Sequence, residues 1–169
     1  MTESLLEQVS ERLGERLLDR QASFGDATVV VAAAGIVEVL TLLRDDPELR
    51  FNLLVDLTAV DYLTRKPRFE IVYHLASLET VPRGREPTRI RHRLRIKVRV
   101  SEDPCEIPSC VEVWPAADWM EREVWDLYGV AFSGHPDLRR ILLYEQFEGH
   151  PLRKDYPKER RQPLVGPRN

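Results

Sequence analysis

The sequence predicts an α+β domain of two layers, in which helices cover one face of a mixed β-sheet, followed by an extended C-terminal tail. The hydrophobic patterns run in the order helix, strand, helix, strand, strand, strand, helix, which is typical of that class. The chain has 169 residues, 43% of them hydrophobic, and is long enough to bury one core. We therefore expect a folded domain over residues 1–148 and a partner-binding tail over residues 149–169.

The tail is the part of the sequence least suited to fold alone. From His150 to Asn169 it holds six lysines and arginines against two acidic residues, together with four prolines. Such a segment buries too little apolar surface to offset its chain entropy. We expect it to become ordered on a partner and to fray at its end.

The overall composition disfavours several classes of protein. The formal net charge is −3, which gives no general reason to expect nucleic-acid binding. No apolar run approaches the ~18 residues of a membrane span, and the acidic start lacks the apolar segment of a signal peptide. We expect a cytoplasmic protein that meets a membrane only through a partner.

The first third of the chain predicts two helices and two strands. Residues 4–20 form the first helix, with a capping box of Ser4 and Glu7 and apolar residues at steps of four as far as Leu17. After a loop, a short strand over 28–31 leads into a second helix over 32–44. The next strand, 51–59, carries apolar residues on both faces and is therefore expected to be central in the sheet.

Two longer strands follow, over residues 68–78 and 88–100, and a polar hairpin loop at 79–87 joins them. In the second strand cations alternate with apolar residues, so six basic side chains line one face. That face could hold a phosphate backbone, but no aromatic residues interleave for base stacking. Cross-strand carboxylates or an acidic partner are the preferred interpretation.

Two pairs of residues suggest a chemical role that we do not favour. Asp56 and Asp61 face opposite sides of one strand, and we expect Asp61 in the turn that follows it. Cys105 and Cys110 lie in an irregular stretch, with four residues between them rather than the two of common zinc and redox motifs. Two ordinary thiols are the simplest interpretation, and a cluster or a disulfide is the alternative.

The stretch 114–129 predicts one helix that contains all three tryptophans. Pro115 suits its first turn, and Gly129 suits a left-handed end. Arg122 can pair with Asp126 one turn later. The expected core face of the helix is apolar, with Met120, Val124, Leu127 and Tyr128 on it.

Beyond the helix a turn sequence occurs twice, fifteen residues apart, as Phe132-Ser-Gly-His-Pro136 and Phe147-Glu-Gly-His-Pro151. A basic pair follows each copy, Arg139-Arg140 and then Arg153-Lys154. Proline favours an extended conformation in the residue before it. We expect an extended, rigid chain here, whose apolar and cationic side chains suit wrapping around a partner's surface.

A longer pattern spans the helix and the first turn: Glu121-Arg122-Glu123, Asp126-Leu127-Tyr128, His135, Arg139 and Ile141-Leu142. It resembles the signature of the 30-kilodalton subunit, also called the C subunit, of respiratory complex I, NADH:quinone oxidoreductase. The ending Gly149-His-Pro-Leu-Arg-Lys-Asp-Tyr-Pro157 is similar to that family's ending. The resemblance covers roughly residues 26–157.

The resemblance implies a non-catalytic structural subunit of the peripheral arm of a proton-translocating complex, where it braces the large quinone-site subunit, called the D subunit, next to iron–sulfur subunits. It implies no cofactor in this chain, because NADH, FMN, iron–sulfur clusters and quinone belong to the whole complex. It also implies a peripheral position on the cytoplasmic side of the cell inner membrane. The alternative is the equivalent subunit of an energy-converting membrane hydrogenase or of another complex I relative.

The charged residues of this region fall into two expected groups. The first forms an internal network that fixes the turn after the helix, or simply packs the domain: Glu121, Arg122, Glu123, Asp126, His135, Arg139 and Arg140. The second lies on the large partner subunit: His150, Pro151, Leu152, Arg153, Asp155 and Tyr156. An independent enzyme that uses His135 and His150 as metal ligands or bases is a weaker hypothesis, because each histidine precedes a proline in a turn.

Overall fold

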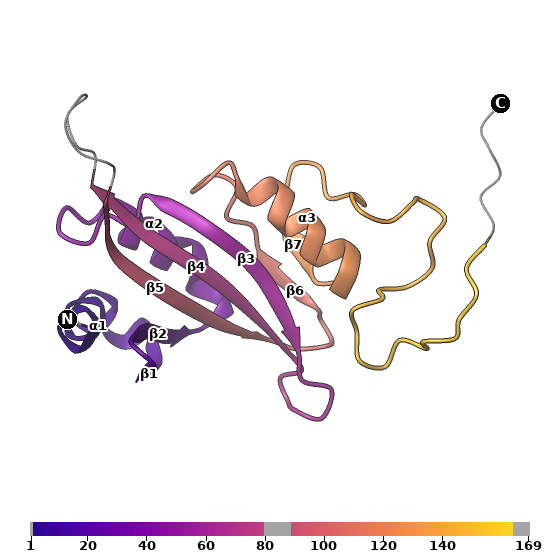
Figure 1. The fold of residues 1–169 in the computed structure, drawn as a ribbon, viewed down its shortest axis with the longest axis horizontal. Coiled ribbons are helices and arrows are strands. Elements are labelled where there is room, and N and C mark those ends of the chain that lie inside the picture. The colour runs from indigo at the N-terminus through magenta and orange to yellow at the C-terminus, as the bar shows by residue number, and fades with distance from the viewer. Residues whose placement is uncertain (1, 80–88, 164–169) are drawn as a thin grey trace.

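The computed structural model describes residues 2–79 and 89–163 and confirms the predicted class, an α+β domain with a mixed sheet. Five strands form the main sheet in the order β1-β2-β5-β4-β3, and two short strands form a second one (Figure 1). Nearly all of the predicted loop at 79–87, and the tail beyond residue 163, lie outside the described residues.

In the main sheet β2 and β5 pair in parallel, and every other pair is antiparallel. Its strands are β1 (Leu17–Ser23), β2 (Asp26–Val31), β3 (Leu53–Asp61), β4 (Phe69–Glu79) and β5 (Arg89–Val100). The helices are α1 (Thr2–Leu13), α2 (Ile36–Asp45) and α3 (Ala117–Tyr128), with short 3₁₀ turns at Gly14–Arg16 and Ala33–Gly35. Within the described ranges, every helix is too short or too polar to cross a bilayer.

One core joins the three helices to the inward side chains of the sheet. In Figure 1 the main sheet lies in front of α2, and α3 lies beside β3. Among the described residues, no helix covers the face of the sheet that is turned toward the viewer, which is called the open face. Tyr73, Phe51 and Phe69 are the largest side chains buried completely in this core.

The first helix is shorter than its leucine spacing predicts. It ends at Leu13, because Gly14 takes a positive φ of 54° and the chain then forms β1. Leu17 continues the four-residue spacing only by coincidence, since it lies in β1 opposite Val31. The predicted capping box was also wrong, because the helix begins at Thr2 and places Ser4 and Glu7 inside it.

The strand expected to be central is instead an edge strand, β3. Its apolar residues reach both faces because the register shifts between Leu54 and Asp56, so Leu53 and Val55 turn outward. The opposite edge strand, β1, carries a register shift too, between Leu17 and Asp19. Such bulges disturb the row of free backbone groups and hinder edge-to-edge pairing with another chain.

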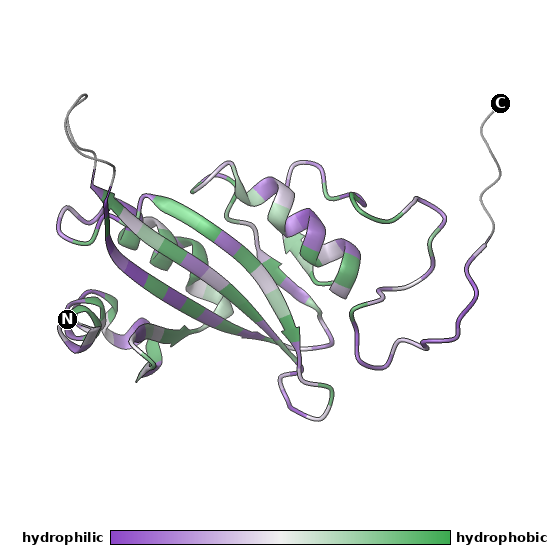
Figure 2. Cartoon of the chain, in the orientation of Figure 1, coloured by the Kyte–Doolittle hydropathy of each residue, from purple (hydrophilic) through white to green (hydrophobic). Residues whose placement is uncertain are grey.

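The predicted alternation along β5 is confirmed over most of its length, and Figure 2 shows it as bands of opposite hydropathy. Leu94, Ile96, Val98 and Val100 are buried while the intervening cations reach the open face. Two of these cations pair with carboxylates across the sheet, Lys97 with Glu70 at 2.9 Å and Arg95 with Asp26 at 3.0 Å.

The stretch expected to be irregular, 101–113, contains a short strand. This strand, β6 (Glu106–Pro108), pairs in parallel with β7 (Ala131–Ser133), and so ties the loop before α3 to the chain after it. Cys105 and Cys110 flank β6 as free thiols. Burial raises the pKa of the Cys110 thiol far above its ordinary value.

Candidate functional site

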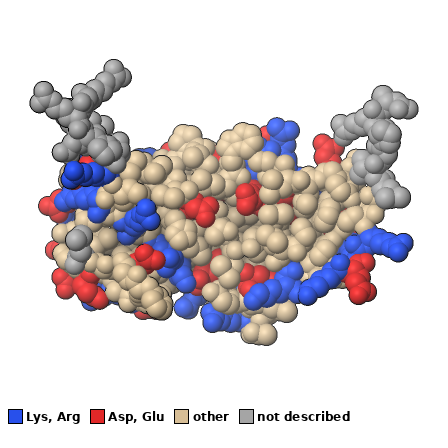
Figure 3. Space-filling view, in the orientation of Figure 1, with Lys and Arg blue, Asp and Glu red and all other residues tan. Residues whose placement is uncertain are grey.

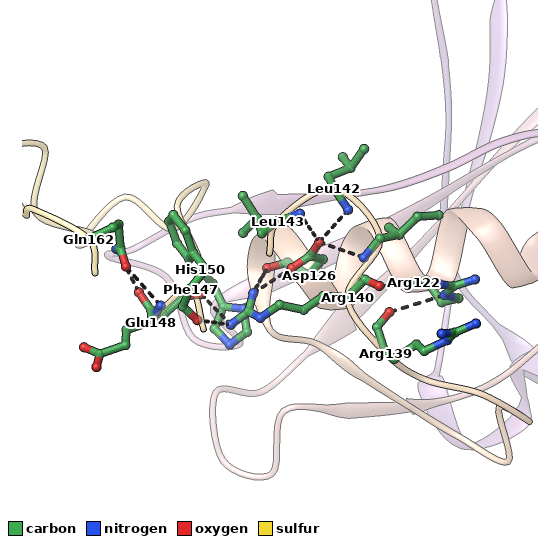
Figure 4. A network of polar contacts seen from close by, with 12 residues as sticks. Arg122, Asp126, Arg139, Arg140, Leu142, Leu143, Phe147, Glu148, His150 and Gln162 are labelled. Carbon is green, nitrogen blue, oxygen red and sulfur yellow. Dashed lines mark hydrogen bonds and ion pairs between the residues drawn. The ribbon is translucent and has the colours of Figure 1, made fainter. Parts of the chain in front are cut away.

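The carboxylate of Asp126, fully buried near the end of α3, gathers the chain that follows the helix (Figure 4). Its Oδ2 accepts hydrogen bonds from the backbone N–H groups of Ile141, Leu142 and Leu143 at 2.9–3.1 Å. Its Oδ1 lies 2.6 Å from Nη1 of Arg140. Three amides and one guanidinium thus hold residues 140–143 in one conformation without any helix or strand.

Asp126 remains ionised in spite of its burial. Burial alone raises the pKa of the carboxyl, but the three amides and Arg140 together outweigh it, so the net pKa is lowered. A charged carboxylate accepts stronger hydrogen bonds than a neutral one. The segment after the helix is therefore fixed by a charged acceptor that water cannot reach.

Two arginines complete the arrangement from opposite sides. Arg140 also donates to the carbonyls of Phe147 and Gly149, at 2.9 and 3.2 Å, and so reaches the tail. Arg122 donates to the carbonyls of Arg139 and Arg140, at 3.3 and 3.4 Å. The prediction that Arg122 pairs with Asp126 is wrong. Arg140 forms the ion pair with this carboxylate, and Arg122 donates to backbone carbonyls instead.

The other predicted network residues lie elsewhere around α3. His135 receives the N–H of Asp137 at Nδ1, 3.0 Å away, so Nε2 carries its proton and faces Asp118 at the start of the helix. Glu121 is fully buried and accepts hydrogen bonds from Ser109 Oγ at 2.6 Å and from the N–H of Cys110 at 2.7 Å. Burial raises the pKa of Glu121.

The side chains of Glu123 and Arg139 are exposed. Within the described part of the chain, the side chain of Arg139 pairs with Asp137 alone, at 2.7 Å, and Arg139 contributes its carbonyl to the network rather than its charge. The buried residues of α3 are Ala117, Glu121, Arg122, Val124 and Asp126. Three of these five are charged, so the inner face of the helix is not the apolar face that the spacing predicts.

The start of the tail caps the C-terminal end of α3. The last carbonyls of a helix lack partners within it, and here His150 Nδ1 donates to the carbonyl of Asp126 at 2.9 Å. The N–H of Leu152 donates to Leu127, and Arg153 Nε donates to Tyr128 at 2.5 Å. The helix has no basic residue of its own in its last turn, so Arg153 also supplies the charge that its dipole favours there.

Gly129 allows the tail to come this close. It ends α3 with a φ of 72°, as the sequence predicts. A Cβ atom at this position would lie 2.5 Å from the ring of His150, closer than any real contact. Only glycine satisfies both the left-handed backbone and the approach of the histidine.

A second cluster anchors the tail farther along, and no sequence pattern indicates it. Arg68, only 4% exposed, forms a two-bond pair with Asp61 at 2.8–2.9 Å and another with Asp155 at 2.7–2.9 Å. Glu102 completes it at 2.5 Å, and the N–H of Lys154 donates to Asp61. Asp61 is thus the buried last residue of β3 rather than a turn residue.

No sequence signal could have found this cluster, because its acidic members are 7, 34 and 87 residues from Arg68. Arg68 lowers the pKa of both Asp61 and Asp155 by hydrogen bonding to them. Of the residues expected on a partner, His150, Arg153 and Asp155 therefore contact this chain's own domain. Tyr156 stacks on Phe147, with ring centroids 6.2 Å apart, while Leu152 turns outward.

The rigid segment leaves large apolar side chains uncovered. Trp119 on α3 and Leu142 beyond it are each 61% exposed, and Arg122 lies over the Trp119 ring at 5.2 Å. Tyr144 and Leu152 are exposed on the chain that follows. Trp119, Leu142, Tyr144 and Leu152 are called the signature surface below.

His135 and His150 bind backbone groups near opposite ends of α3, at Asp118 and at Asp126. Among the residues that the structure describes, no three or more His, Cys, Asp or Glu side chains are grouped closely enough to hold a metal ion. The hydrogen bonds and ion pairs around Asp126 and Arg68 fix the conformation of the chain that follows α3.

Most of the chain, including α3 and the segment after it, is similar to known proteins. Residues 29–162 match the model of the family described as the 30-kilodalton subunit of respiratory-chain NADH dehydrogenase. The chain belongs to this family. The C subunit of NADH-quinone oxidoreductase from Methylobacterium radiotolerans is 48% identical to it over 155 residues. That match covers 91% of this chain and 66% of the relative, so the chain spans about two thirds of the relative's length.

Two further C subunits are similar to the chain to the same degree. The C subunit from Caulobacter vibrioides is 50% identical over 83% of this chain and 66% of its own length. The C subunit from Roseiflexus castenholzii is 47% identical over 91% of this chain and 83% of its own length. A solved structure, the trypsin-resistant fragment of Nqo5, is 30% identical with a TM-score of 0.61 and covers 82% of this chain and 100% of the fragment.

A chain of an archaeal respiratory membrane complex, the membrane-bound sulfane sulfur reductase, superposes with a TM-score of 0.70. The match covers 93% of this chain and 86% of that one, at 24% identity. This likeness shows a shared fold.

Proposed function

We propose that this chain is a non-catalytic structural subunit in the peripheral arm of a proton-translocating NADH:quinone oxidoreductase. In that role it braces the large subunit that forms the quinone site and lies beside iron–sulfur subunits. NADH, FMN, the clusters and quinone are bound by the other subunits. The chain lies on the cytoplasmic side of the membrane and meets it only through its partners. Its family, and its relatives that are named as C subunits, support this proposal.

The observation that carries the bracing role is the immobilised segment after α3. Asp126 and Arg122 are buried and Arg140 is mostly so, and together they fix residues 139–143, yet Leu142 within that segment is mostly exposed. A chain that is already rigid loses little conformational entropy when it binds. Exposed tryptophan and leucine side chains on a fixed backbone are suited to anchor an interface.

The tail extends the same surface. Residues 150–155 are held on the domain by α3 and Arg68, which fixes the position from which the following chain departs. Beyond Pro157, Arg160 pairs with Glu148, and Gln162 exchanges hydrogen bonds with the backbone of Glu148, so the chain as far as residue 162 also lies on residues of the same segment. Leu152, whose side chain is 49% exposed, is the member of the signature surface closest to this point of departure.

The test is a Leu152→Asp variant in the assembled complex. The side chain of Leu152 faces outward, and only its backbone N–H bonds the domain, so the variant keeps the fold by circular dichroism. We expect it to lose co-purification with the large subunit, as does a chain truncated before Gly149. Lys158→Asp serves as a control for the added negative charge, at an exposed position later in the tail.

Normal assembly of both the truncated chain and the Leu152 variant would contradict the bracing role. The other subunits that co-purify also decide between this complex and a membrane hydrogenase that uses an equivalent subunit. The likeness to the archaeal sulfane sulfur reductase chain makes that comparison worthwhile, since the two share a fold at 24% identity.

A further inference from the structure

A groove lies on the open face of the sheet, opposite the helices. It has a volume of about 470 Å³, crosses β3, β4 and β5, and reaches the start of β2 at Asp26. Its apolar lining comes from Leu53, Val55 and Ile90, and its polar rim includes Arg93, His74 and Asp56. Figure 3 shows a row of basic side chains crossing this face along the line of β5. The signature surface lies on α3 and the tail and shares no residue with this groove.

Two irregularities in the sheet create the apolar lining. The register shift between Leu54 and Asp56 turns Leu53 and Val55 outward on β3. A second shift, between Ser77 and Leu78 of β4, places Ile90 outward on β5, although strict alternation predicts it inward. The three side chains are 37%, 52% and 47% exposed. A sheet face built to meet only water gains nothing from three large apolar side chains gathered in one hollow.

The rim carries charge of both signs, with Arg93 and the Arg95–Asp26 ion pair on the side of β5 and β2, and Asp56 on β3. Unlike Arg95 and Lys97, which pair across the sheet, Arg93 has no ion pair or hydrogen bond within the described chain. Asp56 on β3 faces His74 across the strands. Asp56 lies in one row with His74 and Arg95, and Arg93 lies two residues from that row along β5. Arg93 and Asp56 are therefore two strand spacings apart across the sheet and two residues apart along it, roughly 12 Å. The lining also includes the apolar side chains of Leu53, Val55 and Ile90, and His74 on β4.

Two further observations limit the kind of molecule that can bind in the groove. The groove borders β3, the edge strand, so an extended segment can enter it from the side, while the bulge in β3 hinders pairing by backbone. A second copy that docked through the same face, as in a two-fold dimer, would set one hollow against another and leave both unfilled. The shape therefore calls for a protruding side chain from a different protein.

We propose that this groove is a second docking site, which receives a segment of another subunit. That segment carries an apolar side chain that fills the hollow, a carboxylate that pairs with Arg93, and a hydrogen-bond donor that reaches Asp56. The inference rests on the proposed function only in taking the neighbour to be a subunit of the same assembly. With this second site the chain would contact two neighbours, one at the signature surface and one at the open face of the sheet.

The experiment places a photo-crosslinking amino acid, p-benzoylphenylalanine, at Val55 in the assembled complex. The same probe at Leu18, an exposed leucine on the far edge strand, is the control, and a probe at Leu142 reports on the signature surface. We expect the Val55 probe to capture one other subunit, at a peptide with Asp or Glu near the attachment point.

A charge variant completes the test. We expect Arg93→Glu to reduce the Val55 adduct at least about tenfold. Arg99→Glu, which is exposed on the same face of β5 but outside the groove, should leave the adduct unchanged. Replacing the captured carboxylate by lysine should restore the adduct in the Arg93→Glu background.

The inference is overturned if the Val55 probe attaches only to a second copy of this chain, only to lipid, or to nothing, while the Leu142 probe still captures a subunit. It is also overturned if Arg93→Glu leaves the adduct intact. Failure of the Leu142 probe alone would count against the signature surface and not against the groove.

Discussion

Asp126 and Glu121 are both completely buried, five residues apart on α3, yet their pKa values shift in opposite directions. Burial opposes the charged form of both. Asp126 receives three amides and a guanidinium, whereas Glu121 receives one hydroxyl and one amide. At Asp126 the amides and the guanidinium outweigh the effect of burial on the pKa, whereas at Glu121 burial outweighs the two donors.

An Asp126→Asn substitution should be severely destabilising. It leaves Arg140 without its counter-charge and gives the backbone amides a weaker acceptor, and breaking a buried pair in this way costs about 3–5 kcal/mol. Urea unfolding followed by circular dichroism measures the change. Asp137→Asn, which breaks only the exposed pair with Arg139, is the control and should have little effect. Equal effects of the two variants would refute the assignment of Asp126 as the centre of the network.

The raised pKa of Glu121 predicts a pH dependence of stability with a definite sign. The folded state binds this proton more tightly than the unfolded state, so the group's contribution is greatest at low pH. That contribution declines as the pH rises from the ordinary carboxyl range through the raised value. Relative to the parent chain, Glu121→Gln should therefore gain stability as the pH rises across that window.

Unfolding measured at several pH values tests this, with the exposed Glu123→Gln as the control without a trend. The groups with lowered pKa behave in the opposite way. Asp126, Asp61 and Asp155 stabilise the fold above the ordinary carboxyl range and lose that contribution as the pH falls through their lowered values. A trend of the reverse sign in Glu121→Gln would contradict the account of that site.

At the scale of elements, α3 and the tail form one unit, because the tail satisfies the carbonyls that the helix leaves open. Leu152, His150 and Arg153 bond to residues 126–129 of the helix end. The tail boundary expected at residue 149 therefore does not mark the end of contact with the domain. The closeness of the two segments depends on the absence of a side chain at Gly129.

Gly129→Ala should separate the steric effect from the backbone effect. Gly134 also has a positive φ, of 81°, but a Cβ there meets nothing within 4 Å. Gly134→Ala should thus cost only the left-handed strain of about 1–2 kcal/mol. Gly129→Ala should cost more and should speed hydrogen exchange at the Leu152 amide. If the two variants lose equal stability and exchange alike, the packing of His150 against the helix end is not a constraint.

For the region around α3, the sequence predicts where the helix begins and ends better than it predicts which residues contact one another. Period and end signals locate α3 and its left-handed end, because apolar spacing and glycine act locally. They miss the inward positions of Glu121, Arg122 and Asp126, since a hydrophobic period cannot register a buried charge. The β3 bulge likewise gives an edge strand the pattern of a central one, because a single inserted residue moves apolar side chains to both faces.

At the scale of the whole molecule, two charged clusters join distant parts of the chain into one body. Asp126 ties α3 to residues 140–150, and Arg68 ties β3 and β4 to Glu102 and Asp155. Pairings over such separations depend on the completed fold, so no local pattern predicts them. The result is a domain whose signature surface is held rigid from behind while its apolar side chains stay uncovered, an arrangement suited to binding a neighbour.

The central claim is that this surface acts by binding. The most direct measurement is assembly of the complex with a Trp119→Ala/Leu142→Ala chain, compared with Leu18→Ala on β1 as an equally exposed control. Both chains should unfold at nearly the parent's urea concentration. We predict that the double variant fails to retain the large subunit in affinity purification while the control retains it. A double variant that assembles normally and supports full NADH:quinone activity would contradict the account.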